Sequence, residues 1–505
     1  MILVVPTKNR LLSNTYYLFL DWVSITSLGF LFWVILWKFM MPSEFGIMNT
    51  TINLAIFLSG VSLFGFNFVL QKLIPEFLQR NQPLLVSSII RFSLKFVIPI
   101  SLIFTLSFIF FSGPISVILK LPADSVFLTS FGIFLLTLSS IFGGIFYGFQ
   151  NMERLFLTDT LGFSIKIILL SALILISALN YVSGILVYWF GTFLIFLTRF
   201  ETFFWKTKPE KLDNKQVFLY SRSAFISSMT VLLLFNSQYI ILSAIENPST
   251  SGIFSVAFLA ATPLGIIPAT FAGALLPAMS ELSVSKETKE KNQLINIVLR
   301  YATVLTVPFF LLESFFFRSG VNFLNSQYLG AVTYFPIMSV SLIFYGIGTI
   351  FLNSLYALGK TKTYEKVWIT SAFIFLLLSI LMTTFFSALG LTIAYFLTLS
   401  YLMVSSFQLL KKHLKLSLEV RSFFKIFVSG SVFFIFLVFT MTENMGRVGK
   451  ILISISGFMA YLFLLVFLGF FKKKDVNTII RIEGNLPFLK GRLECLKKIL
   501  YKYSE

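Results

Sequence analysis

Two short stretches of this chain resemble each other: PSEFGI at residues 42–47 and PSTSGI at residues 248–253. Each stretch directly follows a long apolar segment that begins beside basic residues. Other landmarks recur at nearly the same offset, because Pro75 and Pro277 each end the next apolar segment and a polar, charged stretch follows. The recurrence predicts one membrane-embedded unit used twice, an arrangement typical of transporters.

The composition places the chain in a lipid bilayer. Hydrophobic residues make up 57% of its 505 residues, whereas charged residues make up only 12%. A soluble protein of this composition would lack the polar surface needed to cover its core. A helix needs about 20 residues to cross the hydrocarbon layer. About fourteen apolar stretches are long enough, at approximately 16–40, 47–71, 92–112, 125–148, 157–178, 181–200, 224–245, 253–278, 301–317, 331–357, 367–387, 389–410, 424–442 and 451–471.

The apolar runs are unbroken and lack the alternation of a membrane barrel, so their backbone groups must be satisfied within helices. We therefore predict an all-α polytopic membrane protein with two pseudo-symmetric six-helix lobes. The expected divisions are an N-terminal lobe (1–200), a cytoplasmic linker (201–223), a C-terminal lobe (224–410), an extra helix pair (411–471) and a basic amphipathic cytoplasmic tail (472–505). The extra pair is either a peripheral addition or a support that holds a lipid substrate near a lateral opening.

The formal net charge of +19 is distributed on one side of the predicted spans. With the N-terminus in the cytoplasm, all but five of the 40 Lys and Arg residues lie at or near the inner side. This asymmetry follows the positive-inside rule. We expect a multi-pass protein of the plasma membrane with both termini cytoplasmic, and we expect no nucleic-acid partner. The five outer cations are Lys38, Lys120, Arg318, Arg447 and Lys450.

Residues for metal binding or acid–base catalysis are scarce. The chain has one histidine, His413, and one cysteine, Cys495, both in segments predicted to be cytoplasmic. Zinc chemistry and histidine-based catalysis lack the residues they need. The predicted outer connections are short, whereas a membrane glycan polymerase or ligase generally needs a sizeable outer loop with catalytic residues. We expect neither an enzyme nor a metal or cofactor.

Basic residues inside the spans are the first functional candidates. A charge at bilayer depth costs on the order of 2.5–3.5 kcal/mol on insertion scales, so it needs a partner or an aqueous cavity. Lys166 lies roughly 13 Å into its span, at 1.5 Å per residue. It is predicted either to face a cavity or to form a structural ion pair. Lys95 and Arg222 can join a substrate site or extend to the inner headgroups.

Acidic residues inside the spans are candidates for ion coupling. Asp21 lies about one and a half turns into the first span, and no basic residue is near it in the sequence. It could bind a coupling cation or face a basic residue across a cavity. Glu313 is the second candidate, although it could simply pair with Arg318.

Amide side chains inside the spans are candidate ligands for sugar hydroxyls. Asn236 and Gln238 lie in the seventh predicted span, and Asn67 and Asn53 lie in the second. The first three are assigned to a central cavity. Such amides equally serve as hydrogen bonds between helices, so both interpretations stay open.

Four motifs resemble those of the Wzx-like polysaccharide-biosynthesis flippases. These belong to the MOP superfamily, which also holds the MATE multidrug extruders and the lipid II flippases. Met41–Gly46 resembles a Gly-Pro-x-x-Tyr-Gly turn, with Met and Phe substituted, and Gly252–Ala257 resembles Gly-x-Tyr-x-x-Ala, with Phe for Tyr. Tyr328–Ala331 resembles Tyr-x-x-Ala, and Ala357–Thr361 resembles Leu-Gly-Lys/Arg-Thr. The resemblance extends to about residue 471.

The resemblance implies a flippase for a polyprenyl-pyrophosphate-linked oligosaccharide, with a two-lobed, V-shaped bundle that alternates between inward-open and outward-open states. Such a glycan is too polar to cross hydrocarbon unaided, so a hydrated cavity is expected in which Lys166, Lys95 and Arg222 attract the pyrophosphate. Expected partners are the lipid-linked oligosaccharide, membrane lipids and a glycan polymerase or glycosyltransferases.

Two departures from the family pattern bear on ion coupling and on the substrate. Family members often carry an acidic residue near the position of Gln238, and its absence here argues against ion coupling at that position. The lipid II branch places several arginines in the cavity wall, and this chain has no such set, so a peptidoglycan precursor is disfavoured. Three alternatives stay open: a multidrug exporter of the same superfamily, a membrane glycan polymerase or ligase, and a scaffold or receptor without transport.

Overall fold

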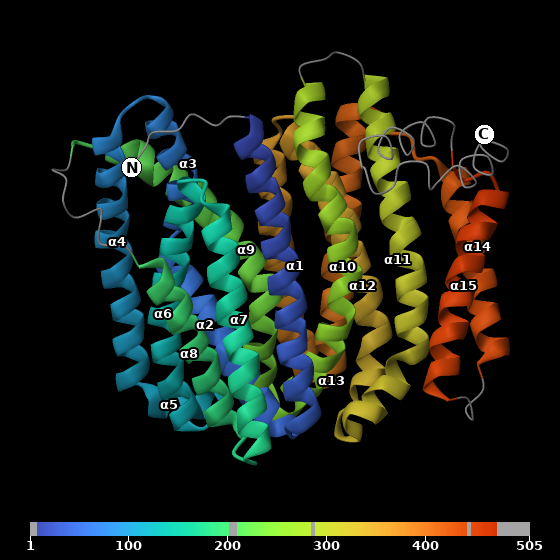
Figure 1. Ribbon diagram of the computed structural model, residues 1–505, viewed down its shortest axis with the longest axis horizontal. Coiled ribbons are helices and arrows are strands. Elements are labelled where there is room, and N and C mark those ends of the chain that lie inside the picture. The colour runs from blue at the N-terminus through green and yellow to red at the C-terminus, as the bar shows by residue number, and fades with distance from the viewer. Residues whose placement is uncertain (1–7, 201–209, 284–287, 442–445, 472–505) are drawn as a thin grey trace. The chain divides into compact units, whose positions relative to one another are not determined.

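The computed structural model describes residues 8–200, 210–283, 288–441 and 446–471. Within these residues every regular element is a helix (Figure 1). The elements in chain order are α1 (Lys8–Phe39), α2 (Pro42–Leu63), α3 (Phe66–Gln79), α4 (Pro83–Phe110), α5 (Ser112–Leu119), α6 (Ala123–Gly148), α7 (Met152–Leu175), α8 (Tyr181–Arg199), α9 (Asn214–Ile245), α10 (Pro248–Ser283), α11 (Thr288–Asn325), the 3-10 turn η2 (Ser326–Tyr328), α12 (Ala331–Ala357), α13 (Thr361–Leu414), α14 (Val420–Thr440) and α15 (Arg447–Phe467).

The predicted multi-pass helical protein is confirmed. Thirteen helices in the described part of the chain are long and apolar enough to cross a membrane. One of them, the 54-residue α13, is interrupted at Ser387, whose φ of 53° and ψ of −144° are not helical. Because α13 is therefore two spans joined at one residue, the number of crossings agrees with the predicted fourteen. The predicted tail, 472–505, lies outside the described residues.

Three helices extend beyond the apolar segments that marked the predicted spans. The helices α3 and α10 continue past Pro75 to Gln79 and past Pro277 to Ser283. Likewise, α11 begins at Thr288, well before the predicted start at 301. A proline removes one helical hydrogen bond, and neighbouring helices in a membrane bundle can compensate for that loss. A polar sequence at the membrane surface does not by itself end a helix.

The second predicted span is broken between α2 and α3. Phe64 and Gly65 both adopt left-handed backbone conformations, with φ of 46° and 77°. The break lies against α9: the Ser221 hydroxyl donates to the Phe64 carbonyl oxygen at 2.5 Å, and the Phe64 ring stacks on Phe225. A side chain on Gly65 would collide with the Ser221 carbonyl oxygen. The break therefore depends on a contact between distant parts of the sequence.

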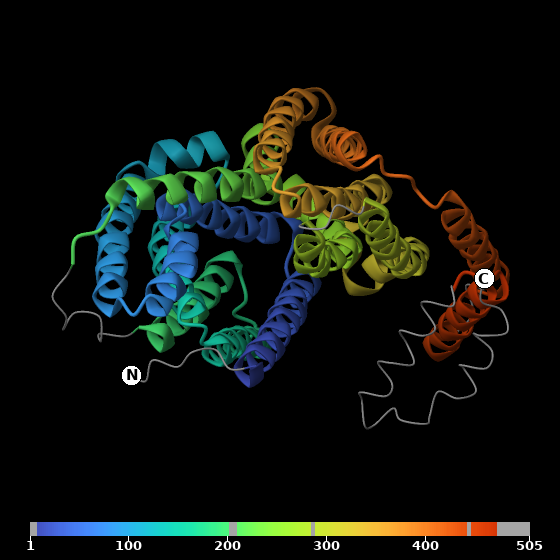
Figure 2. The same cartoon turned by 90° about the horizontal axis from the view of Figure 1, so that it is seen from above.

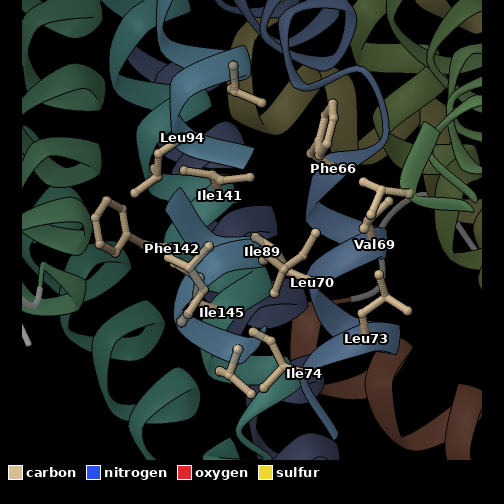
Figure 3. Packing of buried hydrophobic residues seen from close by; sticks show 14 of the residues in the cluster. Phe66, Val69, Leu70, Leu73, Ile74, Ile89, Leu94, Ile141, Phe142 and Ile145 are labelled. Atoms are coloured by element: carbon tan, nitrogen blue, oxygen red, sulfur yellow. The ribbon is translucent and has the colours of Figure 1, made fainter. Parts of the chain in front are cut away.

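The chain forms two compact units, each built from separate segments. Unit 1 comprises Met1–Leu259, Val321–Tyr334 and Glu365–Thr398, and unit 2 comprises Ala260–Gly320, Phe335–Tyr364 and Leu399–Glu505. In unit 1, an apolar core lies between α3, α4 and α6 (Figure 3). In unit 2, α14 and α15 run side by side (Figures 1 and 2).

The two repeated stretches meet each other in unit 1. A Cβ atom on Gly46 of α2 would collide with the Pro248 carbonyl group, and one on Gly252 of α10 would collide with the Pro42 carbonyl group. The contact is therefore reciprocal, as expected for elements related by a local twofold axis. Hydrogen bonds continue it along both helices, because Asn49 Nδ2 donates to Ser255 Oγ at 2.6 Å.

We predict that Gly252→Ala destabilises the protein by roughly 1–3 kcal/mol, because the added methyl group must displace backbone atoms of α2. Gly273→Ala in the same helix is the matched control, since nothing lies within 4 Å of its added Cβ and alanine favours helix. Thermal unfolding in detergent measures both. Equal midpoint temperatures for the two variants would contradict the close crossing.

Candidate functional site

An ion pair is buried inside unit 1. Arg199, the last residue of α8, lies 2.5 Å from Asp159 Oδ2 of α7, and both side chains are less than 15% exposed. The same guanidinium donates to Thr158 Oγ1 at 3.1 Å and to the Ser139 carbonyl oxygen of α6 at 3.2 Å. Gly143 leaves room for it, because a Cβ there would lie 3.0 Å from Arg199 Nη1. Arg199 therefore joins three helices.

Asp21 of α1 lies beside this ion pair. Its side chain is buried, and its Oδ1 atom has no hydrogen-bond partner among the described residues. Asp21 interacts electrostatically with both Asp159 and Arg199. A buried carboxylate with an unused oxygen next to a cation can accept a proton or a small cation.

Lys166 of α7 completes the group, which we call the charge cluster: Asp21, Asp159, Lys166 and Arg199. The Lys166 ammonium lies 3.8 Å from the ring centroid of Tyr188 and 4.5 Å from that of Phe163. Its side chain is only 2% exposed, and it interacts electrostatically with Asp159. A phosphate has no direct access to this ammonium in the present structure, because aromatic rings cover it.

The charge cluster contains two carboxylates and two cations, so its formal charges balance. A balanced cluster does not provide the excess positive charge that attracts an anion, but it allows one carboxylate to change its protonation or partner. Sequence reasoning missed Asp159 and Arg199, because both lie near the ends of predicted spans, where a charge can extend to the headgroups. The signal in the sequence was that an acidic residue, Asp159, and a basic residue, Arg199, lie near the ends of neighbouring predicted spans and could therefore pair.

The two other predicted cations are accessible. Lys95 on α4 and Arg222 on α9 are both exposed, and both belong to unit 1. Asn67 on α3 and Asn236 on α9 are half-buried. These four side chains are therefore not enclosed by protein, whereas aromatic rings cover the ammonium of Lys166.

Gln238 serves as a contact between helices in this structure. It is fully buried, and its Oε1 atom accepts a hydrogen bond from the Tyr395 hydroxyl at 2.8 Å. Its Nε2 atom donates to the Phe235 carbonyl oxygen at 2.8 Å. The side chain thus joins α9 to α13, and both ends of its amide are engaged with the protein.

Glu313 lies in unit 2, on α11. It is half-buried, and its Oε2 atom has no hydrogen-bond partner among the described residues. The structure has no ion pair between Glu313 and Arg318, which is exposed. In the described part of the chain, no group of three or more His, Cys, Asp or Glu side chains could hold a metal ion.

The extra helix pair is fastened to α11 at one end. Arg300 of α11 is 1% exposed and donates to the Phe470 carbonyl oxygen at 3.1 Å. Lys425 of α14 donates to the Gly469 carbonyl oxygen at 2.8 Å. Farther along, the Tyr461 hydroxyl of α15 donates to the Val304 carbonyl oxygen of α11. The pair is therefore an integral part of unit 2 rather than a loose addition.

Comparisons with known proteins identify related sequences and folds. A family model described as "Polysaccharide biosynthesis protein" matches residues 11–283. The lipid II flippase MurJ in an inward closed conformation has a similar structure, with a TM-score of 0.68 and 18% identity over 89% of this chain and 98% of that one. An inward-facing multidrug resistance MATE family transporter of the MOP superfamily also has a similar structure, with a TM-score of 0.62 and 12% identity over 77% of this chain and 95% of that one. A search of curated proteins finds no match.

We predict that Arg199→Gln lowers the free energy of unfolding by about 3 kcal/mol, because it removes the guanidinium group that pairs with the buried Asp159. Arg80→Gln is the matched control, since Arg80 pairs with Glu76 at 2.7 Å but is 63% exposed and such pairs contribute about 1 kcal/mol or less. Thermal unfolding measures both. An Arg199→Gln variant as stable as the control would show that the ion pair is dispensable.

Proposed function

Because the chain belongs to the polysaccharide biosynthesis protein family, we propose that it is a flippase for a polyprenyl-pyrophosphate-linked oligosaccharide. The family and the fold are those of membrane flippases and transporters rather than of enzymes. The proposed direction is from the cytoplasmic to the outer leaflet, by alternating access, for the assembly of a surface glycan. The family match over more than half of the chain carries the proposal.

The proposed path keeps the glycan hydrated while the prenyl chain stays in lipid, because burying sugar hydroxyls and phosphates without partners is costly. The accessible cations Lys95 and Arg222 are the proposed contacts for the pyrophosphate. Asn67 and Asn236 are the proposed contacts for sugar hydroxyls. Lys166 contacts phosphate only in a state that withdraws Tyr188; in the present state its proposed role is to balance the charge of Asp159.

The proposed coupling residue is Asp21. Its unpartnered oxygen lies beside a balanced set of charges, so binding a proton or a cation there changes the net charge of a buried site. Glu313 is the second proposed acid, without a comparable cluster around it. The proposed location is the plasma membrane with both termini cytoplasmic, which the basic inner connections support. A glycan polymerase or glycosyltransferases are the proposed partners.

The proposed phosphate contacts can be tested with a labelled lipid-linked oligosaccharide in proteoliposomes. We expect the double variant Lys95→Gln/Arg222→Gln to need roughly tenfold more substrate for half-maximal flipping, because it loses charged hydrogen bonds to phosphate. Lys411→Gln, an exposed cation at the end of α13, is the control and should match the wild type.

Two outcomes would count against this assignment. Equal behaviour of the double variant and the control would remove Lys95 and Arg222 from the phosphate site. Transport of cationic drugs without any flipping of the oligosaccharide would favour the multidrug exporter, whose superfamily shares this fold.

Ion coupling is tested by imposing proton or sodium gradients across the same vesicles. We expect Asp21→Asn to abolish the response of the flipping rate to the gradient, because the amide neither ionises nor releases a proton at ordinary pH. Glu313→Gln should keep the response. The reverse result would move the coupling site to unit 2, and a full response in both variants would exclude both acids.

A further inference from the structure

The end of α1 is held by residues that lie about 290 positions later in the sequence. Asn325 Nδ2 donates to the carbonyl oxygens of Trp37 and Met40, at 3.3 and 3.1 Å. The Tyr328 hydroxyl donates to the Met40 carbonyl oxygen at 3.1 Å. The last carbonyl groups of a helix lack partners within the helix, so these donors satisfy groups that would otherwise need water.

The end of α9 is held in the corresponding way by the first half of the chain. Lys120 Nζ donates to the carbonyl oxygens of Ile245 and Glu246, at 2.6 and 2.8 Å. A lysine is well suited to this position, because the C-terminal end of a helix carries partial negative charge.

These two contacts occupy equivalent positions in the repeat. Lys120 lies three residues before α6 begins, and Tyr328 lies three residues before α12 begins. Their targets are also equivalent, because α1 and α9 directly precede the repeated stretches at 42–47 and 248–253. Each half of the sequence therefore caps the first membrane helix of the other half.

The two capping side chains differ in exposure. Tyr328 is fully buried, and its ring packs against those of Trp37 and Phe45 in T-shaped, edge-to-face contacts. Lys120 is exposed. Both belong to unit 1, as does the reciprocal contact of Gly46 with Gly252. Where α2 and α10 begin, the two halves of the sequence are therefore joined by three contacts within unit 1. These are the close approach of α2 to α10, the cap of Tyr328 on α1 and the cap of Lys120 on α9.

We propose that Tyr328 and Lys120 are reciprocal latches that hold this side of the protein closed. Opening it separates α2 from α10, and both caps must break for that to happen. The latches set how often the closed side opens. The use of the latches in transport rests on the proposed function, whereas the latches themselves rest on the contacts described above.

The test measures opening directly by thiol labelling. Ser251, fully buried against Thr50 with 3.2 Å between the two hydroxyl oxygens, is changed to cysteine in a Cys495→Ser background. A water-soluble thiol reagent then labels Ser251→Cys in substrate-free protein, at a rate that follows the open population. We expect Tyr328→Phe and Lys120→Met each to raise this rate by roughly fivefold, which is the effect of losing one hydrogen bond. The double variant should show roughly the product of the two increases.

Unit 2 offers matched controls for both changes. The Tyr461 hydroxyl donates to the Val304 carbonyl oxygen at 3.0 Å, and Lys425 caps the end of α15 through the Gly469 carbonyl oxygen. Tyr461→Phe and Lys425→Met remove the same kinds of bond and should leave the labelling rate at the parental value. Should Tyr328→Phe fail to fold, Asn325→Ala replaces it.

Two labelling results would overturn the proposal. In one, the latch variants label no faster than the control variants. In the other, only one of the two latch variants responds, which removes the reciprocity.

A Thr50→Cys/Ser251→Cys pair tests separately whether this side opens during transport, because its disulfide should stop flipping and a reductant should restore it. Flipping that continues with the disulfide formed would show that this side does not open during transport. Absence of flipping in the parent protein would refute the proposed function and leave the labelling result intact.

Discussion

The direct contact between the backbones of α2 and α10 is the constraint on which unit 1 depends. Two glycines allow it, because each one faces a carbonyl group of the opposite helix where a methyl group has no space. This close approach brings polar side chains of both helices within hydrogen-bond reach, including Asn49 and Ser255. It also positions the ends of α1 and α9, which directly precede the two helices. A local backbone contact thereby fixes how the two halves of the sequence meet.

Much of the fold could be predicted because the length of apolar segments and their repetition can be read directly from the sequence. The fourteen crossings and the equivalence of 42–47 with 248–253 follow from the sequence by itself. The break at Phe64 and Gly65 could not be predicted, because Ser221 of α9 stabilises it from far along the chain. The turns of α3 and α10 beyond Pro75 and Pro277 could not be assigned from apolar length either, because neighbouring helices decide whether a helix continues past a proline.

The candidate site shows where prediction from single residues reaches its limit. Lys166 was identified by its depth, but its surroundings are the rings of Tyr188 and Phe163, and no sequence rule gives that contact. Asp159 and Arg199 were missed because each one, taken alone, could extend to the membrane surface. Only the folded chain shows that they pair with each other and lie beside Asp21. Pairing, which the position of a single residue does not reveal, is what keeps Asp159 and Arg199 inside the protein.

The attachment of α14 and α15 has a consequence for the surrounding lipid. Arg300 is buried against the residues that follow α15, so detaching the pair would remove a hydrogen-bond partner from a buried guanidinium group, which is unfavourable. A movement of α11 that preserved these hydrogen bonds would therefore carry the pair with it. Many of its exposed side chains are apolar, such as Phe427 and Phe463, as expected for a surface that faces lipid. A displacement of α11 together with this pair would move an apolar surface through the surrounding lipid. Membrane thickness and fluidity would then contribute to the free energy of that displacement.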